Sequence, residues 1–194
     1  MKKILLFLVS ILLFLLCGCT GYREIDRGYL VTAIGISQEN QKTNIFIEAI
    51  SSSDVADKPS ERVVLTGNGD SIDAAFKKLN SSLVKPLYFE QLGTAVFDDA
   101  LSDKVYMDFL NFLKRLEGIN LGICAVKTNN VKKLFELESP NGVLGYDIMG
   151  LIKMYEKETR IKVVNKLYQL EHNKNPLPTL KLDEDKFILD YQGD

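Results

Sequence analysis

Short runs of β-branched and aromatic residues, separated by polar segments, open the part of the chain that follows residue 28. The runs Leu30–Ser37 and Thr43–Ile50 are rich in Val, Ile, Thr and Phe, the residues that favour β-strands. The polar residues 38–42 between them have the right length for a hairpin loop. We therefore predict an antiparallel strand pair, followed by a third strand over Arg62–Thr66.

The period of the apolar positions then changes to that of a helix. One stripe at helical spacing contains Ile72, Ala75, Phe76, Leu79 and Leu83. Either Asp70 or Ser71 can cap this helix, because its side-chain oxygen can accept from a free amide of the first turn. The preceding Gly67-Asn68-Gly69 lacks the further Gly and Lys residues of nucleotide-binding loops, so we predict a tight turn there.

The rest of the chain continues with the same two patterns. Further strands are predicted over Leu92–Phe97, Asn120–Lys127, Leu180–Leu182 and Lys186–Tyr191, and the last two segments should supply one or two edge strands. Further helices are predicted over Asp103–Leu116, Val131–Leu137, Val143–Glu158 and Lys162–Glu171, with Gly118 ending the first and Asn129 or Asn130 capping the second. This order predicts an α+β (mixed α/β) fold, in which four or five helices pack on a mixed sheet that starts with an antiparallel hairpin.

The first 19 residues have a different pattern, which is typical of a lipoprotein signal peptide. Lys2 and Lys3 precede an apolar run, Ile4–Leu16, and the run ends in Leu16-Cys17-Gly18-Cys19. Thirteen apolar residues are too few to cross a bilayer, which takes about 20. An ordinary secretory site would instead end in a pattern like Ala-x-Ala. We therefore predict lipidation of Cys19 and a membrane-anchored protein outside the cytoplasm.

This interpretation divides the chain into three parts. Residues 1–18 are the signal peptide, residues 19–28 are a polar tether, and residues 29–194 form a single α/β domain. The whole chain has a formal net charge of −2. Loss of Lys2 and Lys3 leaves 22 basic and 26 acidic residues, a net charge of −4, and this balance argues against nucleic acid as a partner.

Few residues of the chain suggest catalysis. Cys124 lies in an apolar strand-like run, where a buried inert thiol is expected. His172 is the only histidine and follows a predicted helix, where a surface role is expected. The acidic pairs Asp98 and Asp99, Asp183 and Asp185, and Glu136 and Glu138 fall in predicted loops or at element ends. We predict no catalytic, cofactor-binding or metal-binding residues, and we expect a protein that is not an enzyme.

Several short motifs follow the order and spacing of one known family. Cys19 is followed at a fixed distance by Glu24-Ile25, although the usual Trp-Asp after the cysteine is missing. Gly35-Ile36-Ser37 is similar to the family's Gly-Ile-Asp. The segments Gly67–Ile72 and Leu87–Leu92 are similar to its Gly-x-Gly-x-Thr-Ile and Leu-Tyr-Phe-Gly-His-Leu. On these residues the chain resembles the N-terminal half of the Ger(x)C lipoproteins, the C subunits of spore germination receptors.

The resemblance implies a lipid-anchored receptor subunit on the outer face of the spore's inner membrane. Its partners would be the membrane-embedded A and B type subunits of a receptor for germination nutrients. The chain has about half the usual family length, so a single-domain relative, a split subunit and a truncated product are all open. A generic extracytoplasmic lipoprotein with a solute-binding or assembly role is the alternative, and an extracytoplasmic hydrolase ranks third.

Overall fold

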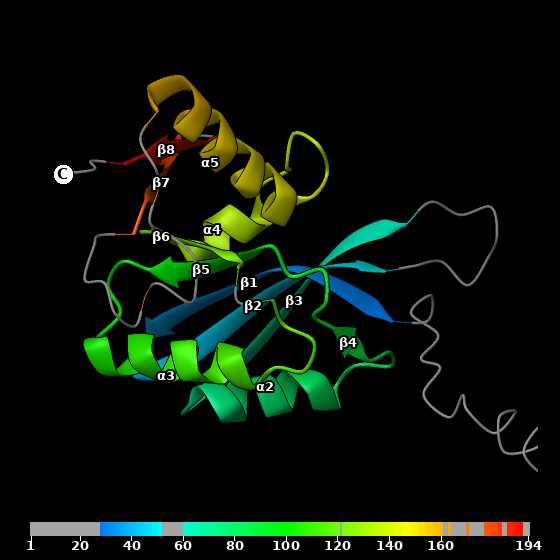
Figure 1. The fold of residues 1–194 in the computed structure, drawn as a ribbon. Helices are drawn as coiled ribbons and strands as arrows, with labels where there is room; N and C mark the ends of the chain where they lie inside the picture. The colour runs from blue at the N-terminus through cyan, green and yellow to red at the C-terminus, as the bar shows by residue number, and fades with distance from the viewer. Residues whose placement is uncertain are drawn as a thin grey trace, which may run out of the picture.

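The computed structural model describes residues 28–51, 60–120, 122–160, 163, 170, 177–183 and 186–191. Cys19, the tether up to residue 27, His172 and all but residues 163 and 170 of the predicted helix Lys162–Glu171 lie outside this part. The described strands form one mixed sheet with two helices on each face (Figure 1). The prediction of an α+β fold with a mixed sheet is therefore confirmed.

The sheet contains eight strands and combines an antiparallel half with a parallel centre. Its strands are β1 (Tyr29–Glu39), β2 (Lys42–Ser51), β3 (Glu61–Gly69), β4 (Leu87–Tyr88), β5 (Thr94–Asp98), β6 (Cys124–Thr128), β7 (Thr179–Asp183) and β8 (Lys186–Asp190). The order is β3-β2-β1-β5-β6-β7-β8, and β4 pairs with the beginning of β1. Strands β1, β5, β6 and β7 run parallel, whereas β2, β3 and β8 are antiparallel to their neighbours.

The hairpin turn between β1 and β2 is tighter than the five-residue loop predicted for it. Only Asn40 and Gln41 lie outside the strands, and both have positive φ, 50° and 64°. Two-residue turns of this kind match the right-handed twist of paired strands, and Asn tolerates the left-handed region better than most residues. The hairpin itself is as predicted.

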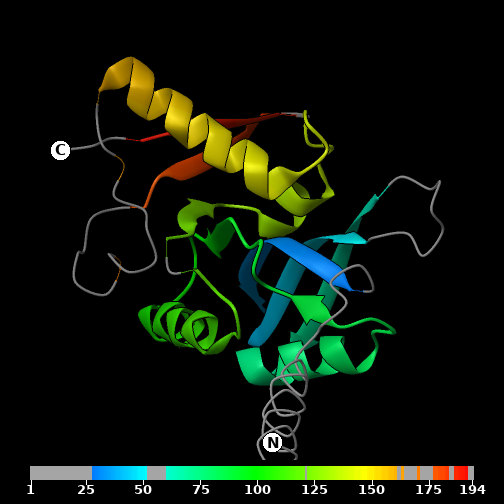
Figure 2. The ribbon, with the colours of Figure 1, turned by 45° about the vertical axis from the view of Figure 1, so that its right-hand side comes forward.

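The four described helices are α2 (Ile72–Ser81), α3 (Asp103–Arg115), α4 (Val131–Glu136) and α5 (Leu144–Thr159). Helices α2 and α3 cover one face of the sheet, and α4 and α5 cover the other (Figures 1 and 2). Ser71, Ser102 and Asn130 cap the first three helices, each accepting from a backbone amide of the first turn. The sequence predicted Ser71 and Asn130 as possible caps.

The predicted turn at Gly67-Asn68-Gly69 is wrong, because β3 continues through Gly69. Helix α2 packs directly on these residues. A Cβ atom at Gly67 would lie 2.5 Å from the carbonyl oxygen of Ala75, and one at Gly69 would lie 2.6 Å from the Ala75 nitrogen. The two glycines therefore allow a close approach of helix to strand rather than a change of chain direction.

Other boundaries also differ from the predictions. β5 and β6 begin at Thr94 and Cys124, later than predicted, and the two-residue strand β4 was not predicted. Both C-terminal strands exist and supply one edge strand, β8, as predicted, since β7 pairs with β6 on its other side. Cys124 is 2% exposed, so the predicted burial of its thiol is confirmed.

Candidate interaction surface

A buried carboxylate organises the face of the sheet that carries α4 and α5. Glu48 lies on β2, and its side chain is completely buried. Its oxygens accept four hydrogen bonds, from Thr32 Oγ1 at 2.6 Å, Arg62 Nε at 2.6 Å, Leu144 N at 2.8 Å and Gly145 N at 3.0 Å. A buried carboxylate is tolerated only with such partners, and here one cation and three neutral donors surround it.

Glu48 takes the place of the missing N-cap of α5. The residue before that helix, Val143, has no side chain that can cap it, and the amides of Leu144 and Gly145 donate to Glu48 instead. A negative charge at a helix N-terminus is favourable, because the amide dipoles converge there. The sheet thus fixes the position of the helix start from 96 residues away in sequence.

Arg62 extends the same network to α4. Its Nη2 donates to the carbonyl oxygen of Phe135, near the end of α4, at 2.8 Å, while its Nε binds Glu48. The end of α4 and the start of α5 therefore both bind to the ion pair that Glu48 on β2 forms with Arg62 on β3. We call Thr32, Glu48 and Arg62, with the backbone groups that they bind, the Glu48 network.

A bulge in β1 completes the fit between the sheet and α5. Thr32 is the extra residue between the paired positions Val31 and Ala33. Its carbonyl oxygen would collide with a Cβ atom at Gly145, so only glycine fits at that helix position. The bulge directs the Thr32 hydroxyl toward Glu48, and it brings the backbone of β1 into contact with the first turn of α5.

The loop between α4 and α5 is held by a second carboxylate, Asp147. Its oxygens accept from the Ser139 hydroxyl, from the Asn141 side-chain amide and, at 3.0 Å, from the Asn141 backbone amide. Burial alone would raise the pKa of Asp147. The hydrogen bonds from Asn141 and Ser139 outweigh burial and lower this pKa below its usual value.

The acidic pairs considered in the sequence do not assemble into a larger group. Asp98 is the last residue of β5 and Asp99 follows it, at the carboxyl ends of the parallel strands, where ligands often bind in open sheets. There the backbone amide of Asp99 donates to the carbonyl oxygen of Thr128, at 3.0 Å, which joins the ends of β5 and β6. Burial raises the pKa of Asp98, the backbone amide of Ala100 opposes this, and the neighbouring Asp99 adds to it.

The other acidic residues lie apart at the surface. Glu136, Glu138 and Asp183 are exposed, and Asp185 lies outside the described residues. Within residues 28–51, 60–120 and 122–160 and the described C-terminal strands, no three His, Cys, Asp or Glu side chains lie close enough to hold a metal ion. No helix in the described part of the chain is long and apolar enough to cross a membrane.

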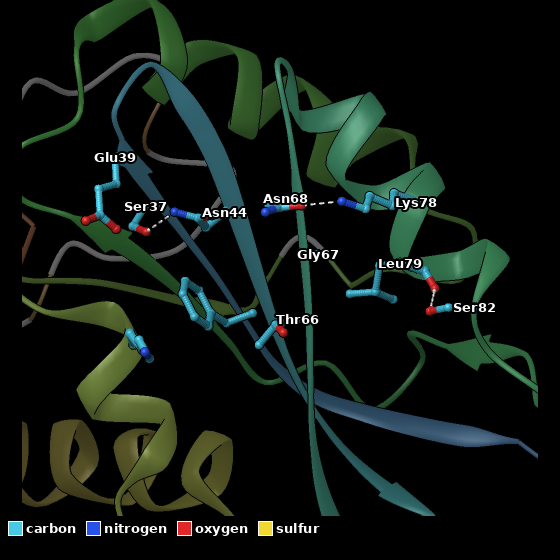
Figure 3. Close-up of a pocket in the computed structure, with 11 residues that line it drawn as sticks. Ser37, Glu39, Asn44, Thr66, Gly67, Asn68, Lys78, Leu79 and Ser82 are labelled. Carbon is cyan, nitrogen blue, oxygen red and sulfur yellow. Dashed lines mark hydrogen bonds between the residues drawn. The ribbon is translucent and has the colours of Figure 1, made fainter.

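An open groove of about 520 Å³ lies along the outer strand of the sheet (Figure 3). We call it the edge groove. Its lining comes from β1, β2, β3, α2 and α4, and it consists of Ser37, Glu39, Asn44, Phe46, Thr66, Gly67, Asn68, Lys78, Leu79, Ser82 and Lys132. Five of these side chains carry a hydroxyl or an amide group and three are charged, so the groove presents both hydrogen-bond donors and acceptors.

Lys78 crosses the free edge of β3 within this groove. Its Nζ donates to Asn68 Oδ1 at 2.6 Å. Asn68 alternates along β3 with Gly67 and Gly69, which contact α2, and it therefore points to the opposite face from the helix that carries Lys78. Figure 3 shows the two side chains on either side of the strand. A lysine at a sheet edge hinders pairing with another strand, which leaves the more N-terminal part of β3 more accessible.

The sequence did not indicate either the Glu48 network or the edge groove. Glu48 is the one acidic residue in an otherwise apolar and neutral strand after Lys42, and that isolated charge is the signal that could have identified it. The edge groove depends on the position of β3 at the end of the sheet, which sequence periodicity does not reveal. The predicted lipidation site, Cys19, lies outside the described residues.

Comparison with known proteins gives one result. No curated protein and no solved structure matches the chain. The family model described as "Spore germination protein N-terminal domain" matches residues 21–175, which include β1 to β6 and all four described helices. The sheet continues past the matched residues, because β7 pairs with β6. The chain therefore belongs to the family of spore germination protein N-terminal domains, as the motifs predicted.

Proposed function

We propose that the protein is a membrane-anchored lipoprotein subunit of a receptor for germination nutrients, and that it acts by contacting other proteins. The observation that carries the proposal is the family match over residues 21–175, directly after an apolar run that ends in Leu16-Cys17-Gly18-Cys19. Family membership links the chain to spore germination. The lipid anchor, the partners and the position on the outer face of the spore's inner membrane are the proposed part.

The chemistry of the described residues supports binding rather than catalysis. The buried carboxylate of Glu48 has all its neighbours engaged in holding α4 and α5, and a general acid or base needs access to a substrate. The edge groove instead offers side-chain amides and hydroxyls, together with the charged groups of Glu39, Lys78 and Lys132, on an open surface. Such groups form the polar parts of protein interfaces. We assign this groove the contact with the membrane-embedded A and B type subunits.

The anchor and its importance can be tested together in spores. Metabolic labelling with an alkyne fatty acid is expected to mark the wild-type chain and not the Cys19→Ser variant. Spores that carry Cys19→Ser should lose nutrient-triggered germination to the same extent as spores without the gene. Germination by calcium dipicolinate, which bypasses nutrient receptors, serves as the control. Persistent labelling of Cys19→Ser, or normal nutrient germination without the gene, would contradict the proposal.

Solute binding is the second candidate, and the size of the edge groove favours it. A volume of about 520 Å³ falls within the range of small-molecule sites, about 300–1,000 Å³. A ligand that binds only the folded state raises the melting temperature. A screen of nutrient amino acids and sugars would support this candidate if one compound raises the melting temperature of the wild type but not of Asn68→Asp.

A further inference from the structure

The point at which the chain enters the fold lies beside the most exposed large apolar side chain among the described residues. Gly28 packs against the ring of Tyr88, and Tyr29 N donates to the carbonyl oxygen of Pro86 at 2.9 Å. Two residues before Pro86 is Val84, whose side chain is 91% exposed. We call residues 82–86, which join α2 to β4, the entry loop.

The entry loop belongs to a segment with an unusual charge for this chain. Residues 74–89 contain no Asp or Glu but include Lys77, Lys78 and Lys85, although the whole chain is acidic. The opposite end of the parallel strands carries Asp98, Asp99 and Asp103 instead. The carboxylates at the same end as the entry loop are Glu61 at the start of β3, Glu90 shortly after β4 and Glu117 shortly after α3. The basic part of this end is the segment of residues 74–89 itself, and an anionic surface is attracted to that segment.

The surroundings of Val84 are also those of a membrane-facing surface. Pro86 is exposed, and Tyr29 and Tyr88 are half-buried beside it. Tyrosine is enriched where one end of a side chain meets lipid and the other meets water. Figure 1 shows β4 and the beginning of β1 at one end of the molecule, away from β7 and β8.

The length of the tether limits how far this end can lie from the anchor. Nine residue steps separate Cys19 from Gly28, and an extended chain covers about 30 Å over that length. The chain enters the fold at Gly28, so this end of the domain is the one held near the bilayer. We infer that the entry loop rests on the membrane surface, with Val84 in the lipid interface and with Lys77 and Lys85 facing anionic headgroups.

This inference rests on the proposed lipidation of Cys19, and a tryptophan probe can test it separately. The chain has no tryptophan, so Val84→Trp introduces a single fluorophore at a position that tolerates it. Met154→Trp on α5 is the matched control, because Met154 is 59% exposed and lies near Lys186 and Phe187 of β8. Both variants are purified from membranes in acylated form, and the acyl group on Cys19 is measured by mass spectrometry.

The proteins are reconstituted into vesicles of phosphatidylglycerol and phosphatidylcholine with or without brominated acyl chains. The indole of Val84→Trp should emit at shorter wavelength in vesicles than in a soluble version that also carries Cys19→Ser, and brominated lipid should quench it. The indole of Met154→Trp should show neither effect and should stay open to aqueous iodide. Adding Lys77→Glu and Lys85→Glu to Val84→Trp should weaken the quenching by brominated lipid.

Three results would overturn the inference, and they can be told apart. An acylated Val84→Trp protein that is quenched by iodide and not by brominated lipid contradicts the entry-loop contact but leaves the proposed function intact. Equal lipid quenching of Val84→Trp and Met154→Trp contradicts a defined orientation. A Cys19 without an acyl group contradicts the proposed anchor, and with it the basis for the contact.

Discussion

The two faces of the sheet are held by different kinds of interaction. Under α2 and α3, aromatic rings pack in a chain that includes Phe76, Phe97, Phe109 and Phe112, with ring centroids 5.1–6.3 Å apart in consecutive contacts. Under α4 and α5, apolar packing is combined with the buried Glu48 network. One face depends on shape and buried area, and the other depends in addition on a set of specific hydrogen bonds.

This difference determines how each face responds to change. Apolar contacts are numerous and individually weak, so a core loses stability in proportion to the volume removed. A buried ion pair is different, because removal of one partner leaves the other buried and uncompensated. We therefore expect the aromatic face to tolerate conservative substitutions, and the network face to be sensitive even to isosteric ones.

The largest effect is expected for Glu48→Ala. It leaves Arg62, Thr32 and two backbone amides without their acceptor, and the free energy of unfolding should fall by about 3–5 kcal/mol in urea denaturation. Glu48→Gln should also lower the free energy of unfolding, because the NH₂ group of its side chain is a donor and would face other donors in the network. In a double-mutant cycle, the variant with both Glu48→Ala and Arg62→Ala should lose clearly less free energy of unfolding than the sum of the losses in the two single variants. Additive costs would show that the two residues do not act as a unit.

A smaller effect is expected for Phe112→Ala on the aromatic face. Phe112 is 4% exposed, and its truncation should lower the free energy of unfolding by about 3 kcal/mol. Phe112→Leu should recover most of that loss, in contrast to Glu48→Gln. Met107→Ala, which truncates a 41% exposed side chain on the same helix, is the control and should cost far less. A loss for Phe112→Leu as large as that for Phe112→Ala would remove the contrast between the two faces.

Gly67→Ala tests the close contact between β3 and α2. The added methyl group would collide with the backbone of Ala75, and such overpacking should cost about 1–3 kcal/mol. Gly150→Ala is the matched substitution on α5, where the new Cβ meets no atom within 4 Å apart from the adjacent residues and backbone of its own helix. It should instead stabilise the protein by up to about 1 kcal/mol, because alanine favours a helix. Equal effects at the two positions, measured by thermal unfolding, would contradict the assigned contact.

The smallest effect is expected in the loop before α5, where Asp147 should make the melting temperature depend on pH. Folding lowers the pKa of Asp147 below its unfolded value of about 3.8. This carboxylate therefore stabilises the fold when the pH is above that value, and the contribution is lost as the pH falls through the lower folded pKa. Asp147→Asn should therefore make the melting temperature less dependent on pH between about 5 and 2. Asn141→Ala removes the side-chain amide donor but keeps the backbone one, so it should change the same slope in the same direction by less. An unchanged slope in both variants would show that these bonds do not matter for acid stability.

The elements that sequence patterns predicted correctly are those that depend on local structure. The helical stripe that starts at Ile72 and the strand runs before it reflect which side chains one element buries, so neighbours in sequence reveal them. Gly67 was misjudged because its role depends on the distance to a helix backbone. Glu48 was missed because its partners Leu144 and Gly145 lie far along the chain. The edge groove follows from strand order, which local patterns do not determine.

The most direct test of the proposed role is photocrosslinking in spore membranes. A photoreactive amino acid replaces Thr66, which is exposed in the edge groove, or Lys153, which is exposed on α5. Light should link the chain to an integral membrane receptor subunit from position 66 and not from position 153. Absence of a membrane partner at position 66, or equal yields at both positions, would contradict a receptor subunit that binds its partners through the edge groove.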